Sequence, residues 1–150
     1  MLKSLAVLVL VLALSNSTGA AMLLSESRLQ ACPGSPNCVH SDELDGYSAI
    51  SPLQPVAPSV SVEQLFTALV EFLEAQKRMK VVELTPSYIR VEAKTRLLGF
   101  VDDLEFELRN DAEFVAVRSA SRRGHSDLGK NRKRIERIRL ALADIGLVRE

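Results

Sequence analysis

The chain has 150 residues, of which 47% are hydrophobic and 25% charged, and its 19 basic side chains equal its 19 acidic ones in number. This length allows one folded unit with a core of its own. The absence of net charge argues against a nucleic-acid partner, because such proteins carry a basic surface. The proportions are those of an ordinary globular protein and exclude a disordered or fibrous chain.

The first residues have the three parts of a secretory signal. Lys3 precedes an apolar run at 5–14, and a tail of small residues ends at Ala20 and Ala21. The run is short for a hydrocarbon core of roughly 30 Å. We therefore expect the signal segment, 1–21, to be cleaved near these alanines and the protein to be exported, either periplasmic or secreted. A retained membrane anchor is the alternative.

The sequence has two cysteines, Cys32 and Cys38, close together among turn-forming residues. In an oxidising compartment such a pair most often forms a disulfide, here worth about 2 kcal/mol. A metal or redox pair is a second reading, but two cysteines with His40 fall short of four zinc ligands. A third is lipidation of Cys32, because Leu29-Gln30-Ala31-Cys32 loosely resembles a lipobox. We expect a structural disulfide, no metal site and no cofactor.

Residues 22–58 form an arm that holds the cysteine pair and most of the prolines of the chain. Proline fixes φ and removes a backbone donor, so the arm should be irregular and packed over a domain at 59–150. Residues 47–50 are a candidate for a short edge strand. At the start of the domain, Ser61 and Gln64 form a capping box, and apolar residues then recur at helical spacing to Leu73.

Four strands are expected to follow, at 81–84, 88–95, 100–108 and 114–120. In the third, Phe100, Leu104, Phe106 and Leu108 share a face, and the same alternation sends Asp102 toward that apolar side. If Asn110-Asp111 is a two-residue turn, Asp103 faces Arg118 and Asp102 faces Ser119. A four-residue loop would instead place Glu105 opposite Arg118.

A last helix is predicted from near Leu128 to just before Gly146. Its apolar seam contains one polar residue, Asn131, and consists of Leu128, Asn131, Ile135, Ile138, Leu142 and Ile145. The expected fold is therefore α+β, with a mainly antiparallel sheet of roughly four strands covered on one face by two helices.

Polar side chains are densest where the fourth strand meets the last helix. Asp102 and Asn131 interrupt apolar faces there, and burying either one unpaired would cost several kcal/mol. One interpretation is a hydrogen-bonded knot that fixes the turn from strand to helix. The other is a binding site for a small polar or anionic ligand or a partner. Its candidate residues are Asp102, Asp103, Arg118, Ser119, Ser121, Arg122, Asp127 and Asn131.

The segment 118–139 is strongly basic, with nine Lys or Arg against Asp127 and Glu136. Its charges at Arg132, Lys133, Arg137 and Arg139 avoid the apolar seam. A charged helix face of this kind is usually solvated. In an exported protein, the alternative is contact of this last helix with anionic lipid or a cell-wall polymer.

The residues favour a non-enzymatic role. His125, Ser126 and Asp127 are the residue types of a catalytic triad, but adjacency in sequence does not create a relay. The enzyme alternative is a hydrolase-like activity with Asp102 and Asp103 as acid and base. A third possibility is a purely structural envelope protein.

Three ordered motifs resemble the family called domain of unknown function 1499 (DUF1499): Cys-Pro-Gly-Ser-Pro-Asn-Cys-Val from Cys32, Gly-Phe-Val-Asp-Asp-Leu-Glu-Phe from Gly99, and Arg-Ser-Ala-Ser-Arg from Arg118 with the residues that follow it. The resemblance implies no activity. It does imply that His40 stands where the family pattern usually has Ser and that His125 lies at a variable position, so neither is a candidate for an essential role. The matching positions are Cys32, Pro36, Asn37, Cys38, Asp102, Asp103, Arg118, Ser119, Ser121, Arg122, Gly124, Ser126, Asp127, Asn131 and Arg132.

Overall fold

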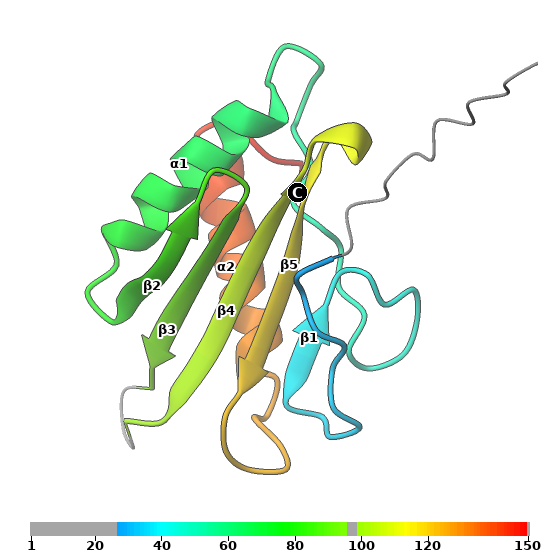
Figure 1. The fold of residues 1–150 in the computed structure, drawn as a ribbon, viewed down its shortest axis with the longest axis vertical. Helices are drawn as coiled ribbons and strands as arrows, with labels where there is room; N and C mark the ends of the chain where they lie inside the picture. Colours follow the sequence, from blue (N-terminus) through cyan, green and yellow to red (C-terminus); the bar gives the residue numbers. More distant parts are fainter. Residues whose placement is uncertain (1–26, 96–98, 150) are drawn as a thin grey trace, which may run out of the picture.

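The computed structural model describes residues 27–95 and 99–149, so the predicted signal segment, 1–21, lies outside the described residues. In chain order the elements are β1 (Cys38–His40), α1 (Val62–Glu74), β2 (Met79–Thr85), β3 (Tyr88–Lys94), β4 (Val101–Arg109), β5 (Phe114–Ser121) and α2 (Lys130–Asp144). The strands form one antiparallel sheet in the order β1-β5-β4-β3-β2. Both helices cover the same face of it, which confirms the predicted α+β class (Figure 1).

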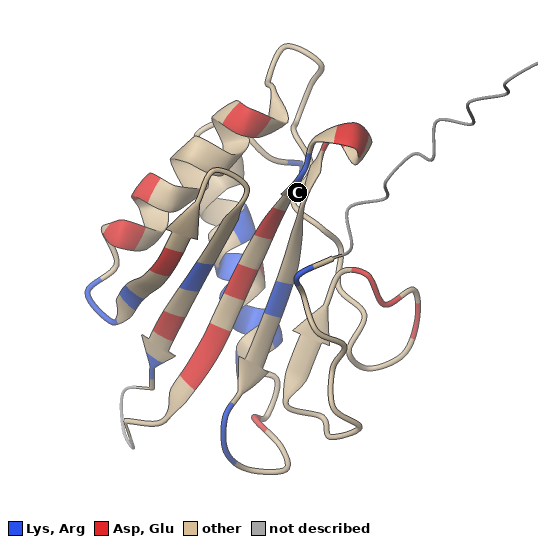
Figure 2. Cartoon of the chain, in the orientation of Figure 1, with Lys and Arg blue, Asp and Glu red and all other residues tan. Residues whose placement is uncertain are grey.

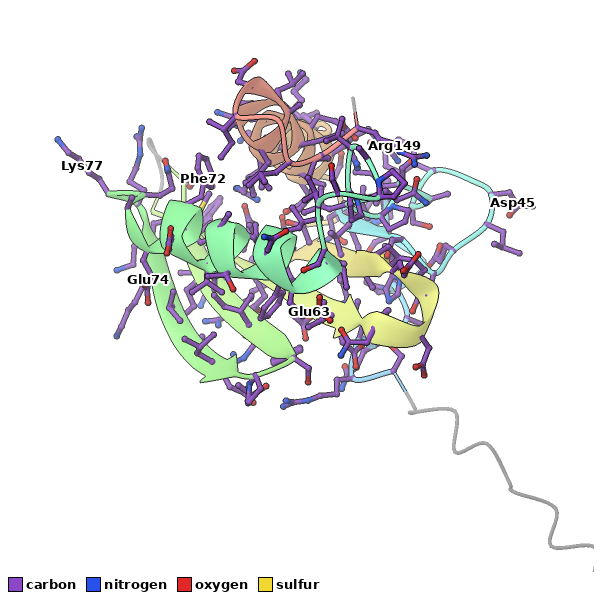
Figure 3. The ribbon with its side chains drawn as sticks, turned by 90° about the horizontal axis from the view of Figure 1, so that it is seen from above. Asp45, Glu63, Phe72, Glu74, Lys77 and Arg149 are labelled. Carbon is purple, nitrogen blue, oxygen red and sulfur yellow. A yellow bond between two sulfur atoms is a disulfide. The ribbon has the colours of Figure 1, made fainter. Side chains whose placement is uncertain are left out.

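The core lies between the sheet and the two helices. Leu104 and Phe106 on β4 alternate inward and are fully buried, and they join Leu65 of α1 and Ile135 of α2 in one cluster. A view along the sheet shows α1 and α2 on one side and the N-terminal described residues on the other (Figure 3). Within residues 27–95 and 99–149, the second face of the sheet carries no helix, and the segment that lies over it comes from the arm (Figure 3).

The start of α1 is as predicted. The Gln64 backbone N–H donates to Ser61 Oγ at 3.2 Å, and the Ser61 N–H donates to Gln64 Oε1 at 2.9 Å. These reciprocal bonds satisfy two of the free donors at a helix N-terminus. Val62, Leu65, Phe66, Leu69 and Leu73 then form the buried face.

The four predicted strands are present, and the sheet has a fifth, β1, that was not predicted. β1 pairs with β5, with Val39 opposite Ser119. The segment 47–50, proposed as an edge strand, contributes only an isolated bridge from Ala49 to His40. A strand of three residues is too short to show a period of two, so its sequence gave no signal.

The two-residue turn between β4 and β5 was the wrong choice, and the four-residue loop is correct. Arg109 pairs with Phe114, Glu105 with Arg118, and Asp102 with Ser121. The loop consists of a single 3₁₀ turn, Asn110–Ala112, followed by Glu113 in a left-handed conformation with φ 54°. Because the loop length changes by two residues, each side chain keeps its predicted face while its cross-strand neighbour changes.

The predicted seam of α2 is confirmed from Asn131 to Leu142, but both ends were wrong. Leu128 is 78% exposed and has a left-handed φ of 54°, and Gly129 is also left-handed. At the other end Ile145 is 64% exposed beside left-handed Gly146. Left-handed residues cannot continue a right-handed helix, so the helical seam stops between them.

The arm is closed on itself by a disulfide, and the pairing of β1 with β5 and the arginines of α2 fix it to the domain. Cys32 and Cys38 are bonded, with their Cα atoms 5.7 Å apart. Arg132 donates to the carbonyls of Tyr47 and Ala49 at 2.6 and 2.7 Å. Arg139, only 6% exposed, donates to the carbonyls of Ser51 and Pro52 at 2.6 and 2.8 Å.

The prediction of a solvated side chain is therefore wrong for Arg139, which is buried, and holds only in part for Arg132, which is partly buried by the carbonyls it binds. Irregular proline-rich backbone leaves carbonyls without strand or helix partners, and a guanidinium can satisfy two of them at once. Among the described residues, no helix has the length and apolar character needed to cross a membrane.

Candidate functional site

On the helix side of the sheet, a buried ion pair lies where β4, β5 and α2 meet. Asp102 is 3% exposed, and its Oδ2 accepts a hydrogen bond from Arg134 Nη2 at 2.5 Å. Arg134 Nη1 also donates to Asn131 Oδ1 at 2.8 Å. The carboxylate that the strand alternation sends inward is therefore neutralised by a guanidinium from the facing helix, as burial of a charge requires.

Asn131 is fully buried, and its amide is the centre of the same group of contacts. Ser119 Oγ donates to Asn131 Oδ1 at 2.6 Å. Asn131 Nδ2 donates to the Asn37 carbonyl at 2.9 Å and to Ser121 Oγ at 3.0 Å. The oxygen thus accepts two bonds and the nitrogen donates two, so the amide is saturated. We call Asn37, Asp102, Ser119, Ser121, Asn131 and Arg134 the inner cluster.

The loop between β5 and α2 is held by Asp127. Its Oδ1 accepts from the Gly129 backbone N–H at 2.9 Å, and its Oδ2 accepts from the Asn131 N–H at 2.7 Å. Asn37 Nδ2 donates to the Gly124 carbonyl at 2.6 Å, which ties the arm to the loop. Asp127 therefore caps the start of α2, and the inner cluster matches the hydrogen-bonded knot that was one of the two interpretations.

On the other face of the sheet, Glu105 links β3, β4 and β5. Arg118 Nη1 donates to Glu105 Oε2 at 2.5 Å, and the Tyr88 hydroxyl donates to Glu105 Oε1 at 2.7 Å. Burial, followed by this bond to a carboxylate, raises the pKa of Tyr88 above its usual range. A few residues along, Arg122 donates two bonds to Asp103, both at 2.7 Å, and one to Glu92 at 2.6 Å.

The hydrogen bonds to Asp103 and, to a lesser extent, to Glu92 raise the pKa of Arg122.

Figure 2 shows the alternation of charge across the sheet, with acidic bands along β4 beside basic bands on β3 and β5. We call Glu92, Asp103, Glu105, Arg118 and Arg122 the outer ladder.

Residues 27–32 cross this outer face, and we call them the strap. Leu29, 6% exposed, packs with Tyr88 and Ala116. The Arg28 guanidinium lies 4.0 Å from the centre of the Tyr88 ring and pairs with Glu83 at 2.5 Å, which lowers the pKa of Glu83. The far end of the strap is Cys32, which the disulfide joins to β1.

The eight predicted ligand residues do not form one site, because the sheet separates them. Asp102, Ser119, Ser121 and Asn131 lie in the inner cluster, with Asp127 at the adjoining cap. Asp103, Arg118 and Arg122 belong to the outer ladder. Asp102 and Asp103 point to opposite faces and each is paired with its own arginine, which is unsuited to an acid and base that share one substrate.

Sequence reasoning missed two members of the inner cluster, Arg134 and Asn37. Arg134 lies three residues after Asn131, and that spacing places two side chains on the same helix face. This signal could have found it. Asn37 contributes a backbone carbonyl to Asn131 from 94 residues away, and nothing local in the sequence indicates that contact.

The sequence His125-Ser126-Asp127 does not form a triad. Both Asp127 oxygens accept backbone N–H groups, and His125 is exposed. A relay would need the carboxylate to hold the imidazole. Among the described residues, no group of three or more His, Cys, Asp and Glu side chains is placed to hold a metal ion.

A set of exposed cations lies in the loop before α2 and along the first half of that helix. Arg123, Lys130, Lys133 and Arg137 are all exposed, and the ion pairs among the described residues include none of them. Lys130, Lys133 and Arg137 are spaced three and four residues apart, which puts them on one side of the helix. We call these four residues the basic rim. Four residues of the basic helix face were predicted to be solvated, and Lys133 and Arg137 are the two that are exposed.

Fold and site together define a small α+β domain that has a saturated polar cluster on one face of its sheet and an ion-pair ladder on the other. The chain belongs to the family described as protein of unknown function (DUF1499), whose model matches residues 28–142. No curated protein and no solved structure matches the chain significantly.

Proposed function

We propose that this protein is an exported, non-enzymatic envelope protein that binds small polar or anionic molecules at the rim of its strand-loop-helix junction. The disulfide between Cys32 and Cys38 is compatible with export, because such bonds persist in oxidising compartments. The N-terminal segment then acts as an export signal. It is either cleaved near Ala20 and Ala21 or retained as a membrane anchor, and the third alternative is cleavage before Cys32 with lipidation of that cysteine.

The binding proposal rests on one observation: at the junction the buried polar groups already have partners within the protein, whereas the exposed cations have no carboxylate partner among the described residues. The carboxylates of Asp102 and Asp127 and the amide of Asn131 are already satisfied within the protein. The basic rim has exposed cations without carboxylate partners among the described residues. A ligand with negative charge therefore gains new ion pairs at the rim without breaking contacts of the inner cluster.

The test is binding of inorganic phosphate and polyphosphate to the exported protein, measured by calorimetry and by the shift in melting temperature. We expect a stabilising shift that increases with ligand charge and declines with added salt. Arg123→Glu/Lys130→Glu should abolish it while leaving the melting temperature without ligand close to that of the unmodified protein.

The matched control is Arg149→Glu, an exposed arginine near the end of the chain. Figure 1 marks that chain end at the end of the sheet away from the start of α2. Binding that is absent in the unmodified protein, or equal in all three proteins, would overturn the proposal.

A further inference from the structure

Leu128 is anomalous among the residues of the junction. It is a large apolar side chain that is 78% exposed, and its backbone is left-handed with φ 54°. Only glycine, asparagine and aspartate adopt that conformation readily, so the backbone at Leu128 is strained. The exposed side chain also gains nothing from burial in the core. The conformation is fixed locally, because the Leu128 N–H donates to Ser126 Oγ at 3.3 Å and Asp127 accepts the N–H groups of Gly129 and Asn131.

Apart from the buried carboxylate of Asp127, which is bonded to backbone N–H groups, the charge nearest to Leu128 in the chain belongs to the basic rim. Lys130 follows it by two residues, and Lys133 and Arg137 continue the same helix side, ending beside Leu140, which is 51% exposed. Leu44 can be compared with Leu128, because it is also exposed, at 98%, but lies in an acidic loop with Asp42, Glu43 and Asp45. Both leucines are exposed, and only Leu128 is accompanied by uncompensated positive charge.

We propose that this surface docks on an anionic phospholipid bilayer, with Leu128 entering the headgroup boundary and the basic rim facing the lipid phosphates. The inference rests on the proposed function and names its partner. A peripheral contact of this kind combines burial of an apolar side chain with attraction of Lys and Arg to the charged leaflet. The loop is already ordered by Asp127, so insertion does not require it to fold first.

The experiment uses the fact that the chain contains no tryptophan. Leu128→Trp places a single fluorophore at the proposed point of insertion, and Leu44→Trp places one in the acidic loop as the matched control. With vesicles of phosphatidylglycerol in phosphatidylcholine, we expect the emission of Leu128→Trp to shift to the blue and to be quenched by brominated lipid. Leu44→Trp should not change, and vesicles of phosphatidylcholine alone should change neither.

The charges are tested in the Leu128→Trp protein. Each cation near an anionic leaflet contributes about a fivefold change in affinity, so Arg123→Glu/Lys130→Glu should weaken binding by well over tenfold. Arg149→Glu should leave it unchanged. Every protein in the series carries the same N-terminal segment, and the fluorescence reports only on the substituted position.

The outcomes separate this inference from the proposed function. If polyphosphate binds at the rim but the Leu128→Trp emission ignores the anionic vesicles, the bilayer inference is wrong and the rim binds a soluble polyanion. Equal blue shifts for Leu128→Trp and Leu44→Trp would also overturn it, because binding would then not be directed by the rim. If neither vesicles nor polyphosphate binds at the rim, both proposals fail.

Discussion

Each face of the sheet carries a polar network, and the two networks differ in how far they are shielded from water. The inner cluster lies under α2, where Asp102 and Asn131 are 3% and 0% exposed and each has its hydrogen-bonding partners within the protein. The outer ladder is covered only in part by the strap, and the side chain of Arg122 is 42% exposed. Similar side chains therefore have different energetic weight, because water screens the pairs made by Arg122. Water is largely excluded from the Asp102–Arg134 pair of the inner cluster and from the Arg118–Glu105 pair at the buried end of the ladder.

This difference bears directly on the binding proposed for the basic rim. A charge inside the inner cluster cannot exchange its partner for a ligand without leaving another buried group unpaired. A cation of the basic rim can. The cations of the basic rim have no carboxylate partner among the described residues. For two of them, Lys133 and Arg137, the sequence predicted a solvated helix face, with contact to anionic lipid or a cell-wall polymer as the alternative.

The largest effect is expected on the inner side. Arg134→Met removes the partner of a buried carboxylate and should reduce the free energy of unfolding by about 3–5 kcal/mol. Urea unfolding of this variant measures it. Arg137→Met, an exposed arginine of the same helix, is the control and should change stability by less than about 0.5 kcal/mol. A loss below about 1 kcal/mol for Arg134→Met would show that Asp102 is not a buried charge.

The next effect concerns the strap. Cys32→Ser/Cys38→Ser should lower the free energy of unfolding by about 2 kcal/mol, since the disulfide closes only a short loop. The measurement is chemical unfolding of the variant beside the unmodified protein with and without reductant. The reduced unmodified protein should match the variant. An unchanged stability in both would mean that the strap is held without the bond.

A smaller effect is expected at Tyr88, the buried residue on the outer face. Tyr88→Phe removes the bond to Glu105 and should reduce stability by about 1–2 kcal/mol at neutral pH. The folded-state pKa of Tyr88 is raised, so the contribution of its hydroxyl is complete below the unfolded value of about 10 and disappears as the pH rises toward the folded value.

The difference in stability between the unmodified protein and Tyr88→Phe should therefore shrink above about pH 10. Unfolding curves recorded across the alkaline range measure this. Tyr47→Phe, at an exposed tyrosine, should show no such trend. A constant difference between the Tyr88→Phe and unmodified curves would contradict the assignment.

The smallest effect is expected in the exposed part of the outer ladder. Arg122→Met breaks the pairs to Asp103 and Glu92, and it should cost at most about 1 kcal/mol because the side chain of the arginine is 42% exposed and its pairs are screened by water. Added salt should reduce that cost further. A loss comparable to that of Arg134→Met would remove the distinction between the two faces.

Much of the fold follows from local patterns in the sequence. The capping box at Ser61 predicts the start of α1, and alternation predicts that Asp102 points inward with Leu104 and Phe106. Both features depend on neighbouring residues, which is why the sequence reveals them. The family motifs likewise contain most of the polar residues of the inner cluster and of the outer ladder, although they do not show that the sheet separates the two groups.

The remaining features depend on contacts or conformations that local patterns do not encode. The length of the β4–β5 loop depends on Glu113 adopting a left-handed conformation, for which glutamate has no preference. Leu128 fits the helical spacing of the apolar residues in α2, but its left-handed backbone keeps it outside the helix. Arg139 looks solvated until the distant carbonyls of Ser51 and Pro52 are placed beside it.

The separation of a structural cluster from a binding rim is tested most directly by the affinity for polyphosphate of Ser119→Ala, measured beside that of Arg123→Glu/Lys130→Glu. Ser119→Ala removes one bond to Asn131, so it should lose about 1 kcal/mol of stability and bind polyphosphate as the unmodified protein does. The rim variant should keep its stability and lose binding. Loss of binding in folded Ser119→Ala, with binding retained in the rim variant, would contradict the account.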